Sequence, residues 1–219
     1  MPRRCLVAAA QERVRPYRED PAFVERRRRL LGRATGRVLD LSLRPQANRA
    51  LLPIERVSDL TVVSGGPAPA QVWISAPPET GGAPGPLGDV RLIAGPLHAE
   101  TFPPASFDTV VTVLTLCTVE ALEPMLEAIG RWLAPTGQLL TLEHIRATGF
   151  TAMAQSLATP FERRLLGGCR LDQDLIGACR HTDLDLTDGA RFSVRVAASL
   201  PIPCLAGVAR PRARNRDRS

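Results

Sequence analysis

The chain has 219 residues, 44% of them hydrophobic, which suffices for one domain with a full core and is too short for two. No apolar run is long enough to span a membrane, and the N-terminus lacks a long hydrophobic stretch with a cleavage site, so we expect a cytoplasmic protein. The net charge of +6 is uninformative, because residues 210–219 alone carry +4 and the preceding residues only +2.

All 28 basic residues are arginine, and only 4% of the chain is aromatic. The cluster Arg26–Arg29 would fan around a helix rather than form one stripe, and few aromatic rings are available to stack on bases. The composition therefore disfavours nucleic-acid binding. The five cysteines are scattered, odd in number and without a CxxC pair, so we predict buried, reduced thiols and neither a disulfide framework nor a metal site.

Residues 1–20 are predicted to be an N-terminal extension. Pro21–Leu31 favours a helix, because Asp20 can cap its first turn and proline is well tolerated there. Short apolar runs then predict strands at Arg37–Leu41, Leu60–Val63 and Val90–Ala94. The long segment 64–89, rich in proline and glycine, is interpreted as a flap or a shortened helix.

A strand, helix, strand unit follows at 107–144. Phe107–Leu114 is a β-branched apolar run without polar alternation, typical of a strand covered on both faces. Apolar residues recur at helical spacing over Glu120–Leu133, and Pro135–Gly137 should end that helix. Gln138–Leu142 then predicts a second buried strand. A right-handed crossover between parallel strands is the expected connection.

The remainder of the chain predicts two helices and two strands. The helices are expected near Phe150–Leu166 and over Asp172–Arg180, with Asp172 as the cap of the second. Phe192–Val196 alternates apolar and polar residues, and Leu205–Ala209 is the last apolar run. Residues 210–219 are predicted to be a disordered arginine-rich tail.

Several of these segments resemble the later motifs of class I S-adenosylmethionine (SAM) dependent methyltransferases, in particular the small single-domain branch that includes thiol S-methyltransferases. The residues that carry the resemblance are Ser106–Val111, Leu116–Val119, Arg131–Leu140, Leu142–His144 and Gly167–Cys169. The resemblance implies one domain over 21–209 with an α/β, Rossmann-like doubly wound sheet. About seven strands are expected, the last two closing the sheet as an antiparallel hairpin. SAM is the implied cofactor.

The cofactor positions implied by the resemblance are mostly degenerate. An acid is kept at the end of the first strand, but the three usual glycines and the two later acids are replaced; these positions are Asp40, then Ser42, Arg44 and Gln46, then Ser64 and Pro96. Glycine lets the cofactor lie directly on the backbone, and the acids bind its ribose and adenine. The lost contacts and added strain amount to at least about 4 kcal/mol, roughly a thousandfold in affinity.

His144 is the candidate general base, since it ends a central strand at the edge where ligands sit in such sheets. A histidine hydrogen-bonded in a structural turn is the alternative. Cys117 lies at a comparable strand end, where a small buried thiol is the simpler interpretation.

Two functions remain open. The first is a pseudoenzyme with the methyltransferase fold that serves as partner or scaffold for an active methyltransferase or a biosynthetic enzyme. The second is an active SAM-dependent methyltransferase that acts on a small molecule, a thiol or other nucleophile, through an atypical cofactor site. The substitutions at Ser42, Arg44, Gln46, Ser64 and Pro96 favour the first.

Overall fold

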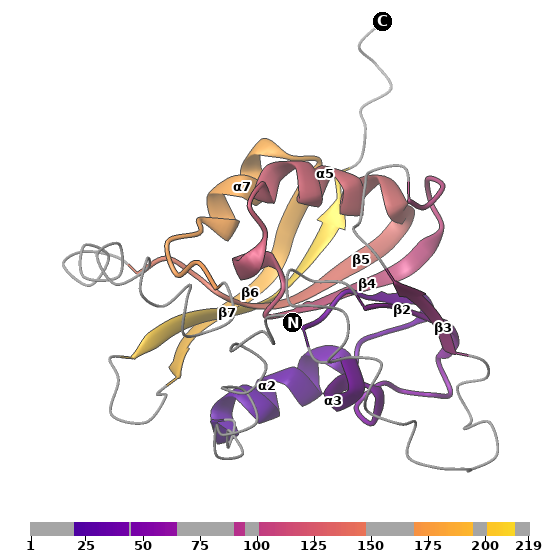
Figure 1. Ribbon diagram of the computed structural model, residues 1–219, viewed down its shortest axis with the longest axis horizontal. Helices are drawn as coiled ribbons and strands as arrows, with labels where there is room; N and C mark the ends of the chain where they lie inside the picture. Colours follow the sequence, from indigo (N-terminus) through magenta and orange to yellow (C-terminus); the bar gives the residue numbers. More distant parts are fainter. Residues whose placement is uncertain are drawn as a thin grey trace, which may run out of the picture.

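The computed structural model describes residues 20–43, 45–64, 90–94, 101–147, 169–194 and 201–212. Seven strands form one sheet in the order β3-β2-β1-β4-β5-β7-β6, with helices α5 and α7 on one face and α2 and α3 on the other (Figure 1). The strands are β1 (Gly36–Asp40), β2 (Val57–Ser64), β3 (Val90–Ala94), β4 (Phe107–Val113), β5 (Leu133–His144), β6 (Leu184–Val194) and β7 (Ile202–Pro211). The helices are α2 (Pro21–Leu31), α3 (Pro45–Arg49), the 3-10 turn η1 (Leu116–Thr118), α5 (Leu122–Trp132) and α7 (Leu175–His181).

The sheet is parallel from β3 to β5, whereas β7 runs antiparallel to both β5 and β6. The predicted α/β fold with a closing hairpin is therefore confirmed. Its carboxyl edge, where β1, β4 and the parallel part of β5 end, brings together the loop after β1, the turn after β4 and the end of β5.

Successive residues of the central strands bury themselves on opposite faces of the sheet. Val38 and Val111 pack in the core layer beneath α2, while Leu39 and Val110 pack in the layer beneath α5 and α7. All four side chains are fully buried. This two-sided burial explains why these strands are continuously apolar rather than alternating.

The structure differs from the predicted element boundaries in the C-terminal hairpin and at the start of α7. The hairpin is longer than predicted, because β6 already begins at Leu184 and β7 continues to Pro211. Arg210 consequently pairs with Asp185 instead of belonging to a tail. The cap of α7 is Asp174 rather than Asp172: its Oδ1 accepts the Gly177 N–H at 2.9 Å, one turn into the helix.

Some predictions lie outside the described residues. These are the N-terminal extension up to residue 19, the flap over 65–89, the helix at 150–166 and the tail beyond residue 212. In the part of the chain that is described, no helix is long and apolar enough to cross a membrane.

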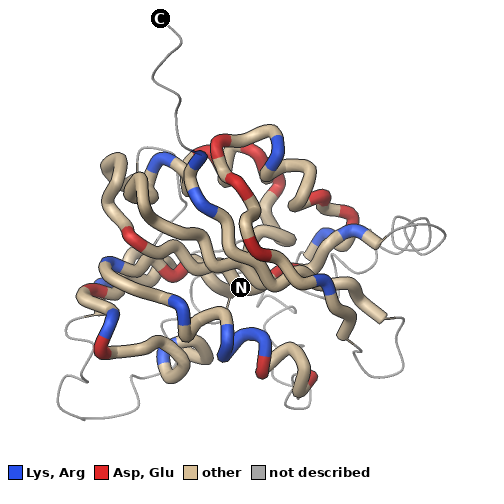
Figure 2. Tube along the Cα trace, turned by 180° about the vertical axis from the view of Figure 1, so that it is seen from behind, with Lys and Arg blue, Asp and Glu red and all other residues tan. Residues whose placement is uncertain are grey.

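Helix α2 begins as predicted, with the Asp20 carboxylate accepting the Ala22 N–H at 2.8 Å. Its arginines do point in different directions, as helical geometry requires. Arg26 lies 4.4 Å from the centroid of the Phe192 ring, whereas Arg29 pairs with Glu25 at 2.6 Å. Basic and acidic residues alternate with uncharged ones along the described chain, seen from behind in Figure 2.

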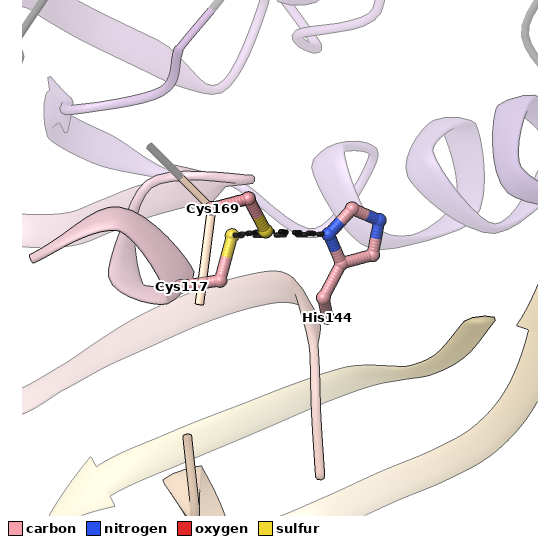
Figure 3. Close-up of side chains that lie close together, drawn as sticks. All are labelled: Cys117, His144 and Cys169. Atoms are coloured by element: carbon pink, nitrogen blue, oxygen red, sulfur yellow. Dashed lines mark hydrogen bonds between the residues drawn. The ribbon is translucent and has the colours of Figure 1, made fainter. Parts of the chain in front are cut away.

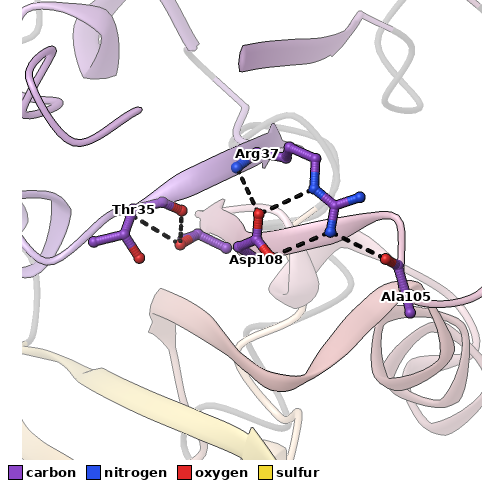
Figure 4. A network of polar contacts seen from close by, with 5 residues as sticks. Thr35, Arg37, Ala105 and Asp108 are labelled. Atoms are coloured by element: carbon purple, nitrogen blue, oxygen red, sulfur yellow. Dashed lines mark hydrogen bonds and ion pairs between the residues drawn. The ribbon is translucent and has the colours of Figure 1, made fainter. Parts of the chain in front are cut away.

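At the amino edge, Asp108 ties β1 to β4 (Figure 4). Its Oδ2 accepts the Arg37 backbone N–H at 2.9 Å and the Nε–H at 3.0 Å, while a second guanidinium nitrogen reaches the Ala105 carbonyl at 3.2 Å. The same carboxylate lies against Gly36, whose φ of +66° and 2.5 Å clearance for a Cβ leave room for glycine alone. The hydrogen bonds from Arg37 lower the pKa of Asp108.

We expect Asp108→Asn to destabilise the protein slightly at pH 7, because both side chains of the pair are more than one third exposed and water screens them. An acid whose folded pKa is lowered stabilises the fold above its unfolded pKa and loses that contribution as the pH falls through the folded value. The difference between wild type and variant should therefore shrink below about pH 3.8, the ordinary value for aspartate. Urea unfolding at pH 7 and pH 3 measures it, and a difference that grows on acidification would contradict this role.

Candidate functional site

The loop after β1 lies closely along β4 instead of turning away from it. The Leu41 N–H donates to the Val111 carbonyl at 2.9 Å, and the Leu43 N–H donates to the Val113 carbonyl at 3.1 Å. The parallel ladder between the two strands thus continues beyond Asp40, the last residue of β1.

Side chains fasten the loop further. The Ser42 hydroxyl accepts the Val113 N–H at 3.1 Å, and the Thr115 hydroxyl donates to the Leu41 carbonyl at 2.7 Å. Ser42 is only 4% exposed. Ser42, at the position where the sequence resemblance predicts the first glycine, therefore serves as a hydrogen-bonding link between the loop and β4, a role that glycine cannot fill.

Asp40 is turned into the protein and is 1% exposed. Its carboxylate accepts the Ser42 backbone N–H at 2.9 Å and the Asn48 side-chain amide at 3.1 Å. Burial raises the pKa of Asp40, while the hydrogen bonds from Ser42 and Asn48 act in the opposite direction. The kept acid stabilises the connection between β1 and α3.

The remaining predicted cofactor positions are spread over several elements. Gln46 is exposed on α3, and Ser64 is the last residue of β2, where its backbone pairs with Ala94 of β3. Arg44 and Pro96 lie outside the described residues. Among the described positions, the structure brings Asp40 and Ser42 into direct contact.

A second group of side chains meets at the same edge, beyond β4 and β5. The Nδ1 of His144 lies 3.0 Å from the Sγ of Cys169 and 4.0 Å from the Sγ of Cys117, and the two sulfur atoms are 3.2 Å apart (Figure 3). His144 ends β5, Cys117 lies on η1, and Cys169 precedes α7. Both cysteines are buried and His144 is partly buried. The candidate base is thus part of a dithiol and imidazole cluster.

Glu143 holds this cluster in place. Its carboxylate is fully buried and accepts the backbone N–H groups of Thr115 at 3.0 Å and Cys117 at 3.2 Å. Burial raises the pKa of Glu143 to about 7, although the hydrogen bonds from the backbone of the turn act in the opposite direction. The turn that carries Cys117 is consequently fixed next to His144.

Sequence reasoning identified His144 but missed both Glu143 and the convergence of the two cysteines. Cys117 and Cys169 are 52 residues apart, so they do not form the short cysteine spacing by which a metal site is recognised in a sequence. The sequence did offer one indication for Glu143, because it directly follows the buried apolar run Leu139–Leu142. A buried carboxylate needs several hydrogen-bond donors around it, which predicts a structured polar contact there.

A cavity of about 410 Å³ lies at the opposite, amino edge of the sheet. Arg33, Arg56 and Arg210 contribute to its lining, but each is engaged with the protein itself. Arg33 pairs with Asp188, Arg56 with the Gly32 carbonyl, and Arg210 contacts the Thr136 carbonyl at 3.4 Å. Ligands of doubly wound sheets bind at the carboxyl edge, so the cavity is the weaker candidate.

Comparison with known proteins identifies the fold. A family model described as a methyltransferase domain matches residues 71–141. The YcgJ protein from Bacillus subtilis is 13% identical, with a TM-score of 0.62, and the likeness covers 89% of this chain and 100% of that one. No curated protein matches the sequence.

Two further solved structures share the fold. The 1,6-didemethyltoxoflavin-N1-methyltransferase of Burkholderia thailandensis, with bound 1,6-didemethyltoxoflavin and S-adenosylhomocysteine, is 18% identical, with a TM-score of 0.56 and coverage of 89% of this chain and 80% of that one. A Haloferax volcanii protein in complex with the methyltransferase activator Trm112 is 14% identical, with a TM-score of 0.55 and coverage of 84% and 88%. The strand order and these structural likenesses show that the chain has the fold of SAM-dependent methyltransferases, and residues 71–141 are similar to a methyltransferase domain.

Proposed function

We propose that this protein belongs to the class I SAM-dependent methyltransferase family and is a pseudoenzyme, which serves as partner or scaffold for an active methyltransferase or a biosynthetic enzyme. The observation that carries the proposal is the loop after β1. Its amides at Leu41 and Leu43 are bound to β4 carbonyls, and the Ser42 side chain occupies the first position where the family keeps glycine. The cofactor would have to approach the backbone of this loop closely. There the Ser42 side chain stands in its way, and the Leu41 and Leu43 N–H groups already donate to β4 carbonyls.

The energetics point the same way. Ser64 ends β2 where the family places an acid for the ribose hydroxyls, and one hydrogen bond to a charged acceptor contributes about 1.5 to 3 kcal/mol. Opening the loop for the cofactor would also break the hydrogen bond between Ser42 and Val113, at about 1 kcal/mol. With the missing adenine contact at Pro96, the sum is at least about 4 kcal/mol, which moves a micromolar site to roughly millimolar.

A role as protein partner is supported by the Haloferax volcanii relative in fold, which forms a complex with a methyltransferase activator. Complex formation between proteins is thus compatible with this fold. A domain that has kept its complete two-layer core while its cofactor loop has changed retains a rigid surface for such contacts. The function of a fold nonetheless depends on its site, so the binding of SAM decides between the candidate functions.

Calorimetric titration with SAM tests the proposal. We expect no saturation of the wild-type protein below about 1 mM. Binding in the micromolar range, with one SAM per chain, would falsify the pseudoenzyme proposal. The appropriate control is an active class I methyltransferase titrated in the same buffer, which must bind under those conditions.

An active methyltransferase for a small nucleophile is the second candidate function. It is favoured by Asp40, the acid kept at the end of β1, and by the Burkholderia thailandensis relative in fold with its bound S-adenosylhomocysteine. In that case His144 is the candidate base, acting through Nε2, since Nδ1 faces the thiols. Micromolar SAM binding together with methyl transfer to a small thiol would establish it.

A further inference from the structure

We propose that Cys117, His144 and Cys169 form a binding site for one Zn²⁺ ion, with a fourth position open to an exogenous ligand. The three donor atoms come from three separate elements and lie within 4.8 Å of one another. This inference goes beyond the proposed function and is independent of it, because the cluster shares no residue with the SAM positions on the loop after β1.

The donor set suits zinc. Two thiolates and one imidazole are borderline-soft ligands, which Zn²⁺ prefers over oxygen ligands, and a set of three protein donors plus one open position is typical of catalytic zinc sites. In the described part of the chain, no fourth protein donor joins the three. The ion would then complete its tetrahedron with water or with an anionic donor such as a thiolate, which it would hold deprotonated.

The distances are compatible with an ion at the centre. Zinc–ligand bonds of about 2.0 to 2.3 Å in tetrahedral geometry place the ligand atoms roughly 3.5 to 3.8 Å apart. The separations here are 3.0, 3.2 and 4.0 Å. Side-chain movements of less than about 1 Å would accommodate the ion. The three side chains lie next to one another, and the Nδ1 of His144 faces the sulfur atoms (Figure 3).

The surroundings fix the donors before the ion arrives. Glu143 binds the backbone of the turn that carries Cys117, and the Cys117 carbonyl in turn accepts the Arg170 N–H at 2.6 Å, next to Cys169. His144 is held by the ladder between β5 and β7, where it pairs with Cys204. Such outer contacts orient ligands and strengthen metal binding, so Glu143 is a positioning residue for this site.

A redox pair of Cys117 and Cys169 is the competing interpretation. Disulfide formation would join the two sulfur atoms and release two electrons and two protons to an oxidant, and it needs no imidazole. The Nδ1 of His144, however, lies 3.0 Å from the Sγ of Cys169, which is closer than the Sγ of Cys117 at 3.2 Å. A third donor aimed at the thiol pair favours a metal site.

The test starts from the reduced, chelator-treated full-length protein, titrated with Zn²⁺ by calorimetry and with Co²⁺ by absorption spectroscopy. We expect one ion per chain, thiolate-to-cobalt charge-transfer bands and the visible bands of tetrahedral cobalt. Cys117→Ser, Cys169→Ser and His144→Ala should each weaken Zn²⁺ binding at least about tenfold, while Cys179→Ala serves as the matched control with unchanged binding. Binding below one equivalent, or equal binding in all four variants, would overturn the proposal.

A measurement on the wild-type protein covers the case in which a variant does not fold. Bound Zn²⁺ should protect Cys117 and Cys169 from alkylation in mild denaturant, whereas Cys179 and Cys204 should react equally with and without the metal. The zinc site would be contradicted if Zn²⁺ left the alkylation of Cys117 and Cys169 unchanged. It would also be contradicted if these two cysteines formed a disulfide under reducing conditions instead of binding the metal.

Discussion

Restoring the glycines and acids of the family site is expected to raise SAM affinity by roughly a thousandfold, from millimolar to micromolar. The variant carries Ser42→Gly, Arg44→Gly, Gln46→Gly, Ser64→Glu and Pro96→Asp. Glycine at Ser42 removes one of the hydrogen bonds that hold the loop against β4 together with its side chain, while the two acids return charged acceptors for the ribose and adenine. Calorimetric titration of the variant against wild type measures the gain.

Single substitutions separate the contributions. Gln46→Gly alone should change SAM affinity little, because Gln46 is exposed on α3, whereas Ser42→Gly should account for part of the gain. An engineered chain that folds with wild-type stability and still fails to bind SAM at 1 mM would show that the pocket is closed elsewhere, and that the loop is not the main obstacle.

The largest effect on stability is expected from Trp132→Ala, at about 3 to 5 kcal/mol. Trp132 ends α5, is fully buried, and meets the Phe102 ring edge-on with centroids 5.2 Å apart. The centroids of the Phe102 and Phe107 rings are 5.0 Å apart, so Phe102 lies between the indole and the Phe107 ring, and the three form one aromatic group. Alanine would leave a cavity there. Urea unfolding at 25 °C gives the free energy of unfolding for variant and wild type.

Trp132→Phe is the matched control, since it keeps one ring and should lose clearly less stability than alanine. The Leu122 side chain, at the opposite end of α5, is 8% exposed and offers a comparison at the rim of the same core. A loss below about 1 kcal/mol for Trp132→Ala would mean that α5 does not depend on this contact, contrary to its complete burial.

Much of the fold could be predicted because its signals are local. The apolar run at Phe107–Leu114 and the helical spacing after Glu120 each follow from the burial of neighbouring residues on one element. The hairpin was harder, since β6 from Leu184 onward carries Asp185, Asp188 and other exposed residues along an edge strand. An edge strand that faces water lacks the apolar signature by which β4 was recognised.

The site could be predicted only in part, because its contacts join distant residues. Sequence position placed Asp40 at the end of β1, Ser42 in the loop that follows it, and His144 at the end of β5. The link between the Ser42 hydroxyl and the Val113 N–H spans 71 residues, and the contact between Cys117 and Cys169 spans 52. Such contacts depend on strand order and register, which follow from the packing of the whole sheet.

Amide hydrogen exchange at Leu41 and Leu43 tests the central claim, that the loop after β1 is closed against β4, most directly. We expect slow exchange at both amides, since their N–H groups are bound to the Val111 and Val113 carbonyls, and we expect the same rates with about 0.1 mM SAM, well below the millimolar affinity. Fast exchange at Leu43 in the free protein, or protection that appears only when SAM is added, would contradict a closed loop and favour the active methyltransferase as the function.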